Sequence, residues 1–444
     1  MLKKYKWIII AGAAILVVLA VVPFLIPMSA YIGQAEQLAS SRLGVPVRIG
    51  SMRIAFLPTP RLKINDMVVG ADEDFSVEGV AVVPALGSLF SEVKTISSLQ
   101  LTRPVMKKSA LDILSAFSKE SGTDSGPAVV IREISIQAAR LLWPDMNLPE
   151  FDVDIEMTAE NKPESARLAT TDGKLKLDLV PEEGRQSITL VASQWTVPAG
   201  MPLLINKMHG QMVLLDNRLD IQQLDIDLYG GKVSANAVLN WQKDWVLNGK
   251  LNVSGMELAE PVGMASKSTR LSGRLFGGGS FKSTAKEPGA LADHISANFQ
   301  FKVEDGVLYG MDLLKAATLL LTAGQSGGET RFDTLSGLLN ISGKQYHLRD
   351  LKVVSGVLNA DGNVKIKPGN ALDGEVKVAV KKGTVLAAIP LHISGTLDSP
   401  MVLPTKAALL GAAAGTAILG PGVGTNIGIQ AVDKVKNLFG GSKE

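Results

Sequence analysis

The chain has 444 residues, of which 46% are hydrophobic and only 5% are aromatic. Lysine and arginine number 45 against 43 acidic residues, and no basic block follows the first residues, which argues against nucleic-acid binding through phosphate contacts. Cysteine is absent, which excludes disulfides, thiolate catalysis and cysteine-based zinc sites.

The N-terminus predicts a transmembrane anchor. Three lysines, at positions 3, 4 and 6, precede an uncharged stretch whose apolar centre runs from Ile8 to Ile26. A run of about 20 apolar residues spans a bilayer, and the positive flank should stay in the cytoplasm. A cleaved signal peptide is the alternative, although its apolar region would have only ~7–15 residues. The anchor positions include Trp7, Ile8, Ile15, Leu19, Phe24 and Ile26.

After the anchor, the pattern indicates a short helix from Gln34 to Leu43 that ends at Gly44. Apolar and polar residues then alternate, as in KLKLDL at 174–179, which predicts strands with one apolar and one polar face. Four such segments supply the apolar positions Leu175, Leu177, Leu179, Leu224, Ile226, Leu228, Leu251, Val253, Val376, Val378 and Val380.

Turn signals separate these segments. Asp-Gly pairs at 172–173, 305–306, 361–362 and 373–374, together with six Ser-Gly pairs, favour hairpins and therefore an antiparallel sheet. Helices are expected at 109–117, 256–268 and 311–321. The tail from 407 to 430 is uncharged and rich in Gly and Ala, which is typical of a packed or partner-facing helical hairpin or of membrane contact.

No reactive constellation is evident. The four histidines are widely separated, and the chain has no HExxH or P-loop motif. Asp225 and Asp227 share the polar face of a strand, where we expect both to be solvated. We therefore predict no enzyme activity, no catalytic residue, no metal site and no cofactor.

Seven motifs occur in an order that resembles the AsmA family of envelope proteins. They are LGVPVRIG at 43–50, LPTPRL at 57–62, LQLTRPV at 99–105, YGG at 229–231, VEDGVLYGMDL at 303–313, TRFDTL at 330–335 and ISGTLDSP at 393–400. The resemblance implies a mainly β protein with short helices, in which a transmembrane helix precedes an elongated, curved antiparallel sheet that forms an apolar groove. The opening segment is similar to the chorein-type start of bridge-like lipid transfer proteins.

The predicted organisation has five parts. They are a cytoplasmic stub and anchor (1–30), a chorein-like region (31–120), a central sheet region (121–300), an AsmA-like C-terminal region (301–403) and a Gly/Ala-rich tail (404–444).

The resemblance implies a single-pass inner-membrane protein with its bulk in the periplasm, which supports phospholipid transport or lipid homeostasis between the inner and outer membranes. The apolar strand positions given above would contact phospholipid acyl chains. Alternation alone does not separate such a groove from an ordinary core. The alternative function is an assembly factor that affects outer-membrane protein biogenesis by pairing an exposed sheet edge with an outer-membrane or periplasmic protein.

Overall fold

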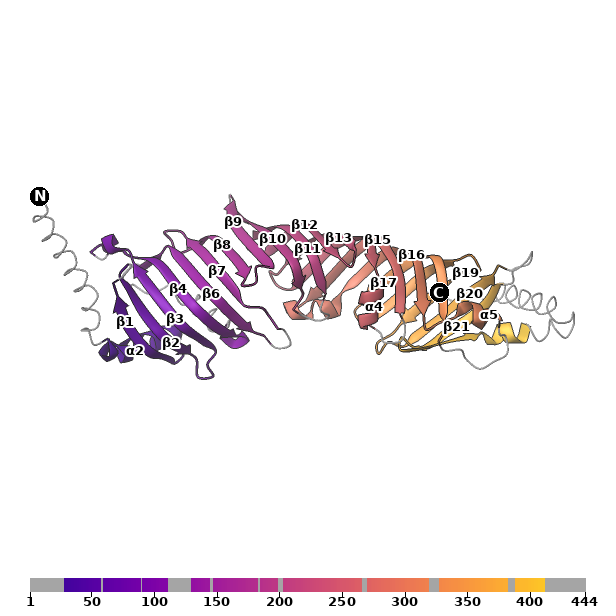
Figure 1. Cartoon of the computed structure of the whole chain (residues 1–444), viewed down its shortest axis with the longest axis horizontal. Helices are drawn as coiled ribbons and strands as arrows, with labels where there is room; N and C mark the ends of the chain where they lie inside the picture. Colours follow the sequence, from indigo (N-terminus) through magenta and orange to yellow (C-terminus); the bar gives the residue numbers. More distant parts are fainter. Residues whose placement is uncertain are drawn as a thin grey trace, which may run out of the picture. The chain divides into compact units, whose positions relative to one another are not determined.

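The structure, a computed structural model, describes residues 28–56, 59–88, 90–110, 129–143, 147–182, 184–198, 203–265, 270–318, 327–381 and 388–411. Within these ranges the chain is mainly β, with 22 strands and a few short helices (Figure 1), as the sequence predicts. The predicted anchor and most of the Gly/Ala-rich tail lie outside the described residues, and no described helix is long and apolar enough to cross a membrane.

The chain divides into two compact units, Met1–Pro202 and Leu203–Glu444. The boundaries expected at 120/121 and 300/301 fall inside these units. The first lies between two strands that pair directly, and the second lies within one strand, β16 (Ser296–Tyr309).

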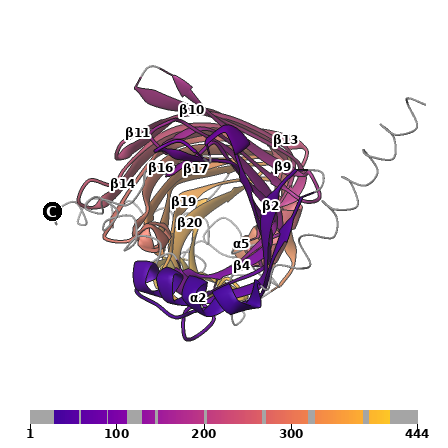
Figure 2. The same ribbon diagram turned by 90° about the vertical axis from the view of Figure 1, so that its left-hand side faces the viewer.

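The first unit begins with helix α2 (Ser29–Leu43), which ends at Gly44 in the left-handed conformation (φ 68°), as predicted. Figure 2 shows α2 at the end of the unit that faces the viewer. The helix packs on β1 (Val47–Ala55) through a small apolar cluster. Its polar side chains also accept backbone hydrogen bonds from this edge strand, at 2.9 Å from the Val47 amide to Ser40 and at 2.7 Å from the Ile49 amide to Glu36.

The sheet of the first unit is antiparallel except at one place. Strand β4 pairs in parallel with β5 and β6, so the fully antiparallel sheet predicted from the sequence is wrong here. The chain between residues 107 and 129 is long enough for the crossover that a parallel pair requires. The other strands are β2 (Arg61–Val69), β3 (Phe75–Pro84), β4 (Lys94–Lys107), β5 (Val129–Ile131), β6 (Glu133–Leu142), β7 (Phe151–Met157), β8 (Pro163–Thr170), β9 (Leu175–Glu182) and β10 (Arg185–Thr196).

The second unit is an antiparallel meander in which each strand pairs with the next one along the chain. Figure 2 shows that its strands bend. Its strands are β11 (Leu204–Leu215), β12 (Arg218–Leu228), β13 (Gly231–Asn240), β14 (Trp245–Glu257), β15 (Arg270–Ala285), β16, β17 (Glu329–Ser342), β18 (Gln345–Val354), β19 (Leu358–Ile366), β20 (Leu372–Val380), β21 (Ala388–Thr396) and β22 (Ser399–Pro404).

Two short helices lie against this sheet where helices were predicted. Helix α4 (Ala259–Ala265) contacts β15, and α5 (Leu313–Thr318) contacts β17 and β20 to β22.

The Asp-Gly pairs differ from the prediction. Only the pair at 172–173 forms a turn, whereas the other three lie inside strands. Asp305 adopts a left-handed φ of 51° beside a register shift between β15 and β16, which marks a bulge. Gly362 and Gly374 sit opposite Val376 and Val364 in regular pairing.

Candidate functional site

Cross-strand register shows that the apolar positions of the first unit form continuous rows. Directly paired residues project from the same face of a sheet, so paired positions can be followed from strand to strand. One row contains Ile54, Leu62, Val82, Leu99, Ile134, Ile155, Ala166, Leu179 and Ile188. Its neighbour contains Met52, Ile64, Val80, Leu101, Ile136, Val153, Leu168, Leu177 and Leu190. No polar side chain interrupts either row.

The second unit has a matching row across all twelve of its strands. This row contains Gly210, Leu224, Ala235, Leu251, Gly279, Phe299, Leu339, Leu348, Val364, Gly374, Ile393 and Val402. We call the face of each sheet that carries such rows its apolar face. The opposite face of each sheet is its polar face.

Charged side chains pair with one another on the polar faces. Arg167 and Asp178 on neighbouring strands are 2.7 Å apart, and Arg103 forms a two-pronged contact with Glu78. The hydrogen bond from Arg103 holds the pKa of the Glu78 carboxyl below its ordinary value. These groups are exposed to solvent, so their ion pairs add little to the free energy of folding. They mainly favour solubility and the correct pairing of neighbouring strands.

The predicted contact residues all lie on the apolar faces, but their exposure differs. Seven are half-buried, namely Leu175, Leu177, Leu179, Leu224, Ile226, Leu251 and Val380. Four are buried, namely Leu228, Val253, Val376 and Val378. The prediction from alternation therefore gave the correct face and did not distinguish free from covered positions.

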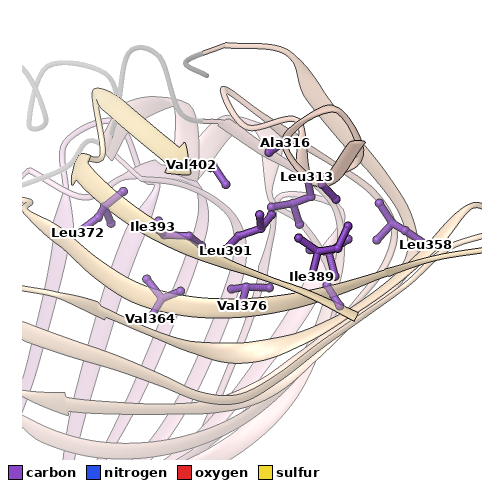
Figure 3. Close-up of a cluster of buried hydrophobic side chains, with 13 residues drawn as sticks. Leu313, Ala316, Leu358, Val364, Leu372, Val376, Ile389, Leu391, Ile393 and Val402 are labelled. Carbon is purple, nitrogen blue, oxygen red and sulfur yellow. The ribbon is translucent and has the colours of Figure 1, made fainter. Parts of the chain in front are cut away.

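The far end of the second unit is a closed core. Val378 and Leu391 are fully buried, and the α5 residues Leu313 and Ala317 complete the cluster. In Figure 3 the side chains of Leu391 and Ile389 lie beside that of Leu313. At this end the protein's own helix covers the apolar face, so Val376 and Val378 are structural and present no free surface.

A smaller closed patch lies under α4. Leu258, Val303 and Phe332 are buried there, with Met256 and Val262 packed against them. In the first unit, α2 covers Val47, Ile49 and Val69 at the start of the sheet. Away from these three clusters, most side chains of the rows are half-buried, as Leu101, Leu177 and Leu251 are, whereas Val80 and Ile188 are buried.

Three phenylalanines on the apolar face of the second unit lie over glycines of neighbouring strands. A methyl group added at Gly249 would come within 2.4 Å of the Phe281 ring, and one at Gly277 within 2.9 Å of the Phe299 ring. Gly337 has the Phe301 ring 3.3 Å from the same position. An aromatic ring over a glycine covers backbone that has no side chain of its own. The FQF sequence at 299–301 hints at this arrangement, but only the register identifies the glycines beneath.

The acidic and histidine side chains of the described residues could bind a metal ion only where several of them are grouped together. No three His, Asp or Glu side chains within the described ranges are grouped to hold a metal ion. Asp225 and Asp227 lie on the polar face, where Asp225 is opposite His209 and accepts a hydrogen bond from Gln223. A depression of about 700 Å³ beside Asp225 is lined mainly by Gln, Asn and Ser side chains of the polar face.

Comparison with known proteins gives no match to a family model, to a curated protein or to a solved structure. The resemblance to the AsmA family therefore stays a prediction from the motifs. The fold and the exposure of the apolar faces carry the functional argument.

Proposed function

We propose that this chain is a non-enzymatic, inner-membrane-anchored periplasmic protein that supports phospholipid transport or lipid homeostasis between the inner and outer membranes. Its half-buried apolar rows would bind acyl chains while the headgroups stay in water. The supporting observation is that no polar side chain interrupts the apolar rows from strand to strand, and that most of their side chains are half-buried between the closed clusters.

A sheet face of this kind must be covered by another element or must bind something apolar. Each methylene removed from water contributes about 0.8 kcal/mol, so an acyl chain laid along a row gains several such increments. Neighbouring strands are about 4.8 Å apart, and in the first unit they present similar, mostly aliphatic side chains along a row. A chain that moves along a row exchanges like contacts for like, so no deep energy minimum arrests it.

Site-specific photocrosslinking tests the proposal. A photocrosslinking amino acid placed at Leu251 or Leu177 in the full chain, in cells, should capture phospholipid. The matched controls are Lys250 and Lys176, which lie one residue away in the same strands and project from the polar face. Capture at the two lysine positions, without capture at the two leucine positions, would falsify the proposal.

The alternative assembly role depends on sheet edges that accept a partner strand, and the two terminal strands offer little. Side chains of α2 already bind two edge amides of β1. The backbone amide of Thr405, the residue after β22, donates a hydrogen bond to the Pro390 carbonyl oxygen in β21. Backbone amides point to alternate sides along a strand, so those of positions 400, 402 and 404 would face away from β21. Pro400 and Pro404 have no amide hydrogen, which protects this edge.

A further inference from the structure

An unusual group of cations lies on the polar face of the first unit. Arg53 in β1 is directly opposite Lys63 in β2, and Arg61 projects from the same face one pleat away. Like charges placed opposite each other across a sheet destabilise it. The strand pattern requires only a polar residue at each of these two positions, so the two positive charges are not needed for the fold.

These three cations have no carboxylate partner within ion-pair distance among the described residues. Arg61 donates to the backbone oxygen and hydroxyl of Thr59, at 3.3 and 3.2 Å. Glu78 borders the same region, but it is already bound by Arg103. Asp66 is the remaining carboxylate at the border, so the group keeps a net positive charge.

The surface beside the cations is hollowed. The row through Arg53 and Lys63 continues to Ala81 and Gln100, and the next row passes through Gly79 to Thr102. The small residues of β3 thus lie between the cations on one side and two polar side chains on the other. The resulting depression has a volume of about 470 Å³.

We propose that this depression binds a phosphate group, either inorganic phosphate or the phosphodiester of a lipid headgroup. Arginine and lysine together suit such an anion, because the guanidinium donates in a planar fork and the ammonium supplies a compact charge. The Gln100 amide and the Thr102 hydroxyl stand across the hollow as further hydrogen-bond donors. The depression has no aromatic side chain in its lining, so it lacks a platform on which a nucleobase would stack.

The test measures binding to the full chain in a neutral detergent and a phosphate-free buffer. Isothermal titration compares inorganic phosphate with glycerophosphoglycerol, a deacylated phospholipid headgroup that cannot bind through acyl chains. We expect saturable binding of at least one of them, weakened about tenfold or more by the double substitution R53Q/K63Q. The tighter ligand of the two identifies the source of the phosphate.

The matched control is Lys176→Gln, which removes a cation from the polar face of β9 in the same unit and should leave binding unchanged. Because R53Q/K63Q removes a repulsive pair, its thermal midpoint should equal or exceed that of the unsubstituted chain. Absence of saturable binding, or binding that R53Q/K63Q leaves intact, overturns the proposal. The site lies on the opposite face from the apolar rows, so its failure would leave the lipid proposal untouched.

Discussion

Two strands of the second unit, β14 and β20, have the same sequence pattern on the apolar face and different packing. Val376 and Val378 in β20 follow a period of two, just as Leu251 does in β14. Helix α5 lies over the β20 end and excludes solvent from Val378, whereas Leu251 stays half-buried. The contrast shows that coverage by another element, and not the alternation itself, decides whether an apolar strand face becomes core or surface.

The largest difference between the two strands should appear when the same charged residue is placed in each. Val378→Glu buries an ionised carboxyl without a partner and should lower the free energy of unfolding by about 4 kcal/mol or more. Leu251→Glu should cost only about 1 kcal/mol, because its side chain can reach water. Urea unfolding of the full chain measures both. Equal losses would mean that the two stretches are equally closed.

A second prediction concerns the glycines under the phenylalanine rings on the apolar face of the second unit. Gly277→Ala places a methyl group 2.3 Å from the Gln300 carbonyl oxygen and 2.9 Å from the Phe299 ring, so the sheet must shift. We expect a loss of about 1–3 kcal/mol of unfolding free energy. Gly289→Ala is the control, because nothing lies within 4 Å of its added methyl group. If the two variants unfold at the same urea concentration, the rings do not lie on the glycines as described.

The smallest expected effect is a pH dependence on the polar face beside the closed end. His347 lies between Asn340 and Lys365, and burial, followed by the charges of Lys365 and Arg349, lowers its pKa from the usual value near 6.5. The folded state therefore disfavours the protonated form. Stability from this residue is present above pH 6.5 and is lost as the pH falls through the lowered pKa.

His347→Gln should flatten this part of the stability profile, as measured by urea midpoints at closely spaced pH values. A midpoint that rises on acidification in the unsubstituted chain, and no longer rises in the variant, would show that the sign of the shift is wrong.

Several features could be predicted from the sequence because local physics determines them. The end of α2 at Gly44 follows from the left-handed turn that glycine adopts, and the face of Leu177 follows from a strand period of two. The Asp-Gly pair at 305–306 misled the prediction because a bulge and a hairpin can use the same dipeptide.

The remaining features depend on partners distant in sequence. The parallel pairing of β4 with β6 requires a crossover that no local pattern announces. Burial of Val378 depends on α5, and the hollow beside Arg53 depends on Gly79 in another strand. The register between strands brings these residues together, and this register cannot be read from a single sequence.

The central claim is that the half-buried apolar rows receive acyl chains. Native mass spectrometry of the full chain, extracted gently from membranes, tests it most directly when Leu251→Glu and Lys250→Glu are compared with the unsubstituted chain. We predict several copurifying phospholipids in the unsubstituted chain and in Lys250→Glu, and a reduced number in Leu251→Glu. Lipid-free protein in all three preparations, or the same number of lipids in all three, would contradict the claim.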